Sequence, residues 1–185
     1  MKDKTRTIEI IGTIIPLILI VLFAMSIAYR NELSSFIGGK AKISGYIFII
    51  IISAILELIP QLIAPTWIMI NAAILELPLF MTTVYIIIGS TLGATLGYVL
   101  GRKYGIEFAI KMFGKKKISR AAKLFNSEGR WFVAIAALTP LPYLTIVFGA
   151  LGMSPKNITL FGLIPRAISY IILCITIKLG ISIFG

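Results

Sequence analysis

Histidine is absent from this sequence, cysteine occurs once, and only 7 residues are acidic. Without histidine the chain cannot form a Ser-His or Cys-His pair to activate a nucleophile. The single cysteine, Cys174, lies in an apolar stretch, which excludes a disulfide framework and the Cys/His spacing of a zinc site. The few carboxylates are not spaced to meet at one catalytic site. We therefore expect no enzyme, no metal site and no cofactor.

Basic residues, by contrast, number 18, and nine of them fall between Arg102 and Arg130. A cationic block of this kind is typical of a cytoplasmic loop in a membrane protein and attracts anionic lipid headgroups. Nucleic acid is a weaker alternative, because the block is short and flanked by apolar segments, and we expect no such partner. The side chains expected at the anionic-lipid surface are Lys115, Lys116, Lys117, Arg120 and Lys123.

Apolar residues dominate the chain: 58% are hydrophobic, and the mean hydropathy is +1.01. This composition predicts an all-α integral membrane protein with a single domain over residues 1–185. The first apolar run, residues 8–28, is long enough to cross a hydrocarbon layer of roughly 30 Å. Three cations before it place the N-terminus in the cytoplasm. We expect a multi-pass protein of the cell (inner or plasma) membrane, with a transmembrane helix and an outer loop over residues 1–42; a cleaved signal peptide is the alternative.

The segment Tyr46–Leu75 is too long for one straight span and too short for two. Pro60 and Pro65 divide it, and each half would reach about half-way across a membrane at about 1.5 Å per residue. Backbone without hydrogen bonds at that depth must face protein or water, so we predict a re-entrant helical hairpin that turns at these prolines. A kinked single span is the alternative. With the span Pro78–Gly101 that follows, the hairpin forms a first repeat over residues 46–101.

Glycines recur every four residues along the span of the first repeat. They are Gly89, Gly93, Gly97, Gly101 and Gly105. Such a stripe lets another helix approach closely. We interpret it as a packing face within the monomer; an interface in a homo-oligomer is the alternative.

The order of hairpin and span then occurs again. A basic amphipathic segment over residues 102–130, expected on the cytoplasmic membrane surface, leads into a second repeat over residues 131–179. There an apolar run is broken by a Thr-Pro-Leu-Pro sequence, and a long apolar helix follows. With the N-terminus inside, the first hairpin enters from outside and the second from the cytoplasm. We therefore predict an inverted repeat, as in many transporters, with the broken segments meeting near the midplane.

Several short motifs follow one another along the chain. They are Glu57 with Pro60 and Pro65; Gly93, Tyr98, Gly101, Arg102 and Gly105; Gly129; Thr139-Pro140-Leu141-Pro142; Phe148, Gly149 and Met153; and Phe161. In order and spacing they resemble the DedA family, the membrane proteins that share the VTT or SNARE-associated Golgi-protein domain, over about residues 46–179. The positions that depart from the bacterial pattern and indicate a divergent branch are Thr66, Ala94, Ala137 and Tyr143.

This resemblance implies movement of lipid between leaflets. It implies recycling of a polyprenyl-phosphate carrier in bacterial members and phospholipid scrambling in eukaryotic ones, with proton coupling proposed for the former. We therefore expect a lipid transporter, either flippase or scramblase, whose partners are membrane lipids. A small-solute or ion transporter on the same scaffold is the alternative, because fold does not fix function. A non-transporting membrane assembly factor is a further one.

Two charges, Glu57 and Arg166, lie inside apolar segments. Both should sit near the midplane, where a lone charge costs about 2.5–3.5 kcal/mol. We expect them to line one cavity, with the arginine attracting an anionic headgroup and the carboxylate releasing it on taking up a proton. A salt bridge that only ties the first hairpin to the last helix is the alternative. The residues expected beside them at the substrate or coupling site are Pro60, Pro65, Thr139, Pro140, Pro142 and Tyr143.

Overall fold

The structure is a computed structural model, and it describes residues 42–58, 65–138 and 144–184 with a few residues between 21 and 32. Every regular element within 42–58, 65–138 and 144–184 is a helix, which confirms the all-α prediction. The predicted span over residues 8–28 lies mostly outside the described residues. So do five residues expected at the hairpin turns: Pro60, Thr139, Pro140, Pro142 and Tyr143.

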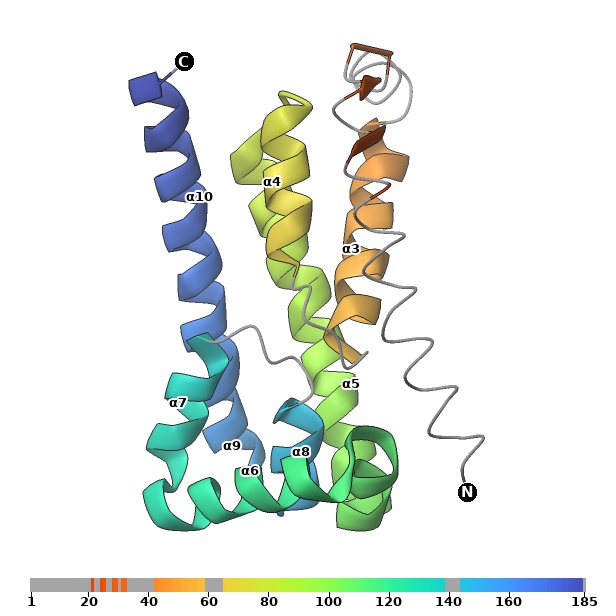
Figure 1. The fold of residues 1–185 in the computed structure, drawn as a ribbon, viewed down its shortest axis with the longest axis vertical. Coiled ribbons are helices and arrows are strands. Elements are labelled where there is room, and N and C mark those ends of the chain that lie inside the picture. Colours follow the sequence, from red (N-terminus) through yellow and green to blue (C-terminus); the bar gives the residue numbers. More distant parts are fainter. Residues whose placement is uncertain are drawn as a thin grey trace.

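The helices form an elongated bundle with a shorter layer across one end (Figure 1). In chain order they are α3 (Lys42–Leu58), α4 (Thr66–Ile74), α5 (Leu79–Phe113), α6 (Lys115–Glu128), α7 (Arg130–Leu138), α8 (Leu144–Ala150), α9 (Pro155–Ile158), the π-helical turn η1 (Thr159–Leu163) and α10 (Ile164–Phe184). The long helices α5 and α10 run most of the length of the bundle, whereas α3, α4, α7 and α8 each cover only part of it.

The first half of the bundle consists of α3, α4 and α5 (Figure 1). α4 runs back toward the level at which α3 begins, and α5 then runs in the direction of α3. The parallel course of α3 and α5 follows from their contacts, because Gly89 lies against Ile50 and Gly93 lies against Ala54. The break in the apolar segment thus falls between α3 and α4, as the two prolines predict.

The end layer consists of α6 and the last part of α5, after the kink at Gly105 (Figure 1). Three glycines with positive φ shape it: Gly105 (73°), Gly114 (89°) and Gly129 (60°). Left-handed backbone is favourable for glycine and costly for other residues, so these positions permit sharp changes of direction. The chain bends within α5 at Gly105, and α6 lies across the end of the bundle (Figure 1). α6 buries Ile118 and Ala121 and exposes the five cations predicted for the anionic-lipid surface.

The second half of the described chain begins at this end layer. α7 leads away from α6 into the bundle, α8 runs back, and α9, η1 and α10 form one continuous path to the opposite end (Figure 1). α8 packs tightly on α5, since Gly101 lies against the backbone of Ile146 and Gly149 against the backbone of Tyr98. Side chains larger than hydrogen at these two glycines would separate the helices.

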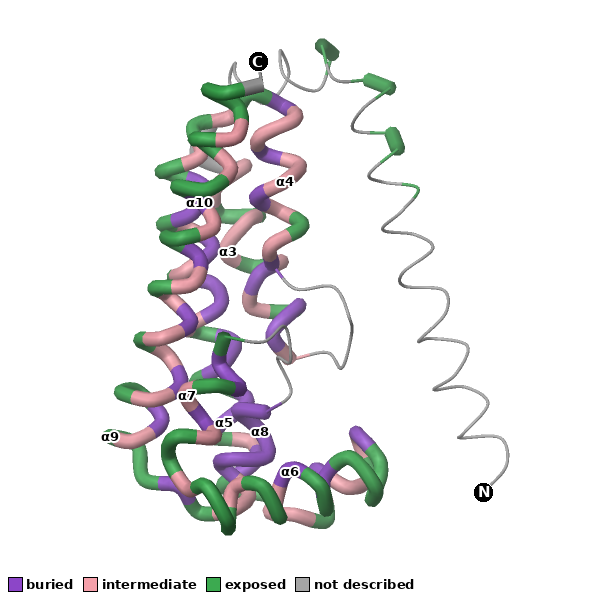
Figure 2. Tube along the Cα trace, turned by 60° about the vertical axis from the view of Figure 1, so that its left-hand side comes forward, coloured by how far each residue is buried: buried purple, intermediate pink, exposed green. Residues whose placement is uncertain are grey.

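The protein has a core at the end layer and a smaller one higher in the bundle. The first gathers around Val133, Ile146 and Val147, and the second around Met69 and Ile86. Buried residues concentrate on α8 and on the facing parts of α4 and α5, while exposed residues run along α6 and α10 (Figure 2). The first core therefore lies where α6, α7 and α8 meet α5, and the second lies where α4 and α10 meet α5.

The outer faces of the long helices are apolar although they are not covered by protein. Leu92 of α5 is 51% exposed and Ile172 of α10 is 57% exposed. Two helices, Leu79–Phe113 and Pro155–Ile183, are long and apolar enough to cross a membrane, and only 39% and 28% of their apolar windows are buried. The core helix of a soluble protein would be mostly buried, so these surfaces fit contact with lipid.

Candidate functional site

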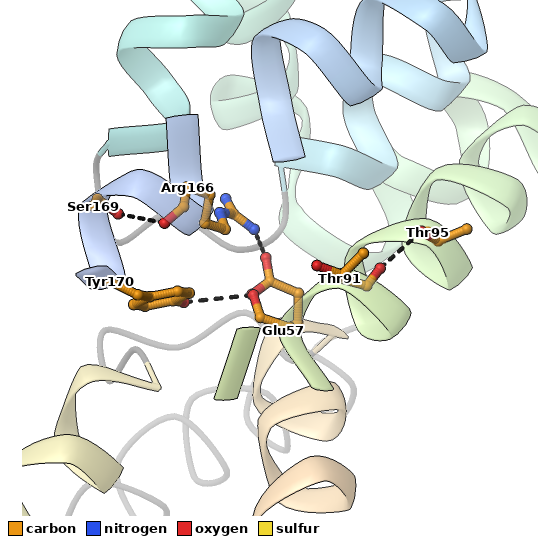
Figure 3. A network of polar contacts seen from close by, with 7 residues as sticks. Glu57, Thr91, Thr95, Arg166, Ser169 and Tyr170 are labelled. Atoms are coloured by element: carbon orange, nitrogen blue, oxygen red, sulfur yellow. Dashed lines mark hydrogen bonds and ion pairs between the residues drawn. The ribbon is translucent and has the colours of Figure 1, made fainter. Parts of the chain in front are cut away.

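The candidate site forms where the end of α3 meets the beginning of α10 (Figure 3). Glu57, in the last turn of α3, pairs with Arg166, in the first turn of α10, through carboxylate Oε1 and guanidinium Nη1. The side chains of both are buried, with 1% and 9% of their surface exposed. The structure thus brings together the two charges that the sequence placed at one depth, and each supplies the counter-charge that the other needs in an apolar environment.

Two further side chains complete the polar cluster. Ser90 of α5 donates a hydrogen bond to Oε2 of Glu57 at 2.8 Å, and the hydroxyl of Tyr170 lies 3.5 Å from that of Ser90. Arg166 and Ser90 therefore hold one carboxylate oxygen each. Sequence reasoning missed both residues. One signal was available: Tyr170 follows Arg166 by four residues, so the two share a helical face.

The close approach of Glu57 to α5 depends on Gly93. A Cβ atom at this glycine would lie 2.7 Å from Cβ of Glu57 and 2.9 Å from Cα of Ala54. Only a residue without a side chain lets the last turn of α3 approach α5 this closely. Gly93 therefore sets the position from which the carboxylate reaches both Ser90 and Arg166.

Gly97 lies between two helix ends that are far apart in the sequence. A Cβ there would lie 3.5 Å from Leu58, at the end of α3, and 3.0 Å from Thr145, at the start of α8. Of the predicted stripe, Gly89 and Gly93 face α3, Gly97 faces α3 and α8, and Gly101 faces α8. Gly105 does not continue the stripe, contrary to the sequence analysis: its added Cβ would meet nothing within 4 Å, and it marks the kink instead.

The helix that carries Arg166 is irregular just before it. Pro165 has no N–H and its ring disturbs the preceding turn, and residues Thr159–Leu163 form a π-helical turn in which Ile164 donates to the carbonyl of Thr159. π-Helical turns are rare and often lie at functional sites. Here the irregular turn directly precedes the only charge that α10 contributes to the cluster.

The structure also describes Pro65 and the cations of α6, which the sequence predicted as site residues. Pro65 is buried at the start of α4, and the cations of α6 lie exposed at the end layer. Among the described residues, no group of three or more His, Cys, Asp or Glu side chains could hold a metal ion. The groups that the cluster offers are one carboxylate, one guanidinium and the hydroxyls of Ser90 and Tyr170, which can bind an anion or a proton.

A second polar contact links α5 to the chain after α8. The Tyr98 hydroxyl donates to the carbonyl of Met153 at 2.7 Å and accepts a hydrogen bond from Arg102 at 2.9 Å. Tyr98 is buried, whereas Arg102 is exposed. This contact fixes the position at which the chain leaves α8 and turns into α9.

The chain is similar to a known protein family over most of its length. The family model of the VTT domain matches residues 59–177, a range that begins directly after α3 and includes most of α10. No curated protein and no solved structure matches the chain. The match and the two long apolar helices together indicate a membrane protein. Because the matched residues make up well over half of its length, the chain belongs to the VTT-domain family.

Proposed function

We propose that this protein moves an anionic lipid, either a phospholipid or a polyprenyl-phosphate-type lipid, between the leaflets of the cell membrane. In this proposal α5 and α10 cross the membrane, and the pairs α3–α4 and α7–α8 are re-entrant hairpins that enter from opposite sides. The N-terminus and α6 lie on the cytoplasmic side. Support comes from the apolar outer faces of the long helices and from the exposed cations of α6, which suit a surface of anionic headgroups.

The observation that carries the proposal is the buried pair Glu57–Arg166. Placing charges in an apolar environment is costly, and a buried ion pair is often no more stabilising than apolar residues of similar volume. A pair that joins the first hairpin to the last helix therefore suits a role in substrate handling. The guanidinium would exchange its partner carboxylate for the phosphate of a headgroup, and the carboxylate would displace that phosphate again or take up a proton while the arginine is occupied.

The test uses purified protein in proteoliposomes with fluorescent lipids and an external reagent that quenches only the outer leaflet. We expect wild-type protein to expose inner-leaflet lipid to the quencher, and Glu57→Gln and Arg166→Gln to abolish this while remaining folded. Glu107→Gln, which neutralises an exposed carboxylate on the same chain, is the control and should act as wild type.

Other outcomes would decide against lipid movement. Flux of ions or small solutes without lipid movement in the same vesicles would identify a solute transporter. If neither lipid nor solute moves in the wild type, the assembly-factor alternative gains support. If each single change unfolds the protein and the swap Glu57→Arg with Arg166→Glu restores folding, the pair is structural.

A further inference from the structure

A narrow recess lies on the face between α5 and α10, beside the ion pair. Its walls bound about 170 Å³, a figure that includes space open to the surroundings and no part wide enough for a water molecule. Its lining consists of Ile87, Ser90, Thr91, Leu163, Arg166, Ala167 and Tyr170. Arg166 is thus the one charged member of the lining, and three of the other members carry hydroxyl groups.

These groups suit a phosphate. A guanidinium has five N–H donors in a planar fork, more than one carboxylate can accept, and the fork matches two phosphate oxygens. The hydroxyls of Thr91 and Tyr170 can donate to the remaining oxygens, and that of Ser90 can do so once it no longer donates to Glu57. No carboxylate lines the recess itself, but Glu57 lies directly behind it, bonded to Arg166 and Ser90. An anion must therefore displace Glu57 to reach the guanidinium fully.

The surroundings of the recess suit the tails of an amphiphile. The residues that neighbour its lining along the two helices are large, apolar and exposed: Ile88, Leu92, Ile164 and Ile168, each between 41% and 51% exposed. Acyl chains could lie on these side chains while the headgroup reaches inward. A free phosphate ion would gain nothing from them, so the geometry favours phosphate attached to an apolar chain.

The recess also adjoins the irregular part of α10. In the present conformation it has no room for a water molecule, so a headgroup needs α10 to move away from α5. Leu163 both lines the recess and ends the π-helical turn, and Pro165 follows within two residues. Helices bend most readily at π-turns and prolines, which places a hinge at the level of the recess.

We propose that the recess between α5 and α10 is a lateral binding site through which the phosphate of a lipid passes between the membrane and Arg166. The proposal rests on the lipid-transport function and adds the path by which the headgroup reaches Arg166. The headgroup takes the place of Glu57 on the guanidinium, the hydroxyls of Thr91 and Tyr170 hold it together with that of Ser90 once Glu57 has been displaced, and the tails remain outside the protein.

A binding assay tests the recess without requiring transport. Purified protein in a neutral detergent is titrated with monododecyl phosphate, and thermal stability reports binding. We expect stabilisation of the wild type and at least about tenfold weaker binding for Ala167→Leu, which fills the recess. Ile181→Phe, which adds bulk at an exposed position of α10 about three turns beyond the last lining residue, should bind as wild type. Thr91→Val removes one hydroxyl at nearly constant volume and should weaken binding about threefold; it decides the matter if Ala167→Leu does not fold.

Three results would overturn the proposed binding site: no stabilisation of the wild type by monododecyl phosphate, unchanged binding by the recess variants that fold, or stabilisation by inorganic phosphate equal to that by monododecyl phosphate. Lipid movement in vesicles that persists at the wild-type rate in Ala167→Leu would reject the recess and leave the proposed function intact. Binding that depends on the recess, in a protein that moves no lipid, would instead reject the proposed function alone.

Discussion

Replacing Gly93 by alanine should destabilise the protein because the new methyl group has no space. The added Cβ would lie 2.7 Å from Cβ of Glu57 and 2.9 Å from Cα of Ala54, and atoms in proteins essentially never approach a Cβ closer than 3.0 Å. One of these neighbours is backbone and cannot turn aside, so α3 must move away from α5. Overpacking of this kind typically costs about 1–3 kcal/mol. For a chain of this size that corresponds to a loss of roughly 2–12 °C in melting temperature.

The matched control is Gly180→Ala in α10, where an added Cβ meets nothing within 4 Å. Alanine in an open helical position is favoured over glycine by about 0.5–1 kcal/mol, so this variant should melt at or above the wild-type temperature. Gly97→Ala should fall between the two, because its neighbours are side-chain atoms at 3.0–3.5 Å that can adjust. Gly93→Leu and Gly97→Leu should both be severely destabilised or fail to assemble.

The measurement is thermal unfolding of each variant in the same detergent, followed by fluorescence. Equal melting temperatures for Gly93→Ala and Gly180→Ala would refute the reasoning and place the stripe against lipid. A second readout ties packing to the site: because Glu57 must shift, Gly93→Ala should also lose lipid movement, whereas Gly180→Ala should keep it.

Three other predictions concern the rest of the chain. Tyr98→Phe removes the hydroxyl that donates to the carbonyl of Met153 and should lower stability by about 1 kcal/mol, seen as a lower melting temperature. Unchanged melting would show that another group replaces the hydroxyl. We expect the wild type to be more stable in nanodiscs of anionic lipid than in nanodiscs of neutral lipid. Replacing Lys115–Lys117 with glutamine should reduce this difference by up to about 1 kcal/mol per charge, and an unchanged difference would show that α6 does not contact the lipid surface. Single cysteines in a cysteine-free background should be labelled from the cytoplasm within Lys115–Lys117 and Thr139–Pro142 but only from outside within Gln61–Ala64; labelling of both turns from one side would exclude the inverted repeat.

The sequence predicted those features that depend on composition and spacing along the chain. A proline cannot continue a helix and restricts the residue before it, so the sequence predicted a break at Pro60 and Pro65. The observed end of α3 at Leu58 and start of α4 at Thr66 agree with it. Charges in apolar segments are costly enough to require partners, so Glu57 and Arg166 could be assigned to one site before their contact was known.

Other features depend on which faces of different helices meet, which spacing does not reveal. Ser90 belongs to the site because α5 turns it toward Glu57, and nothing in the neighbouring sequence distinguishes it from Thr91 or Thr95. Gly105 continues a four-residue repeat, yet its backbone has φ of 73°, so it bends the helix instead of packing against another. The π-helical turn before Pro165 likewise requires the three-dimensional path of α10, because proline can also be accommodated by a simple kink.

The double change Glu57→Leu with Arg166→Met separates the two roles that the ion pair can have. Removing one partner leaves a buried charge unpaired, which typically costs about 3–5 kcal/mol, whereas replacing both with apolar residues of similar volume is often neutral or stabilising. The double variant should therefore melt at or above the wild-type temperature, although the loss of the Ser90 hydrogen bond to Oε2 offsets part of the gain.

If the pair only ties α3 to α10, a well-packed apolar contact would serve as well, and lipid movement would continue. If Arg166 receives the phosphate, the double variant should be folded and inactive. A stable double variant that moves lipid at the wild-type rate would refute the role of the pair in transport, and an inactive one with an intact melting transition would leave substrate handling as the reason for placing two charges in the bundle.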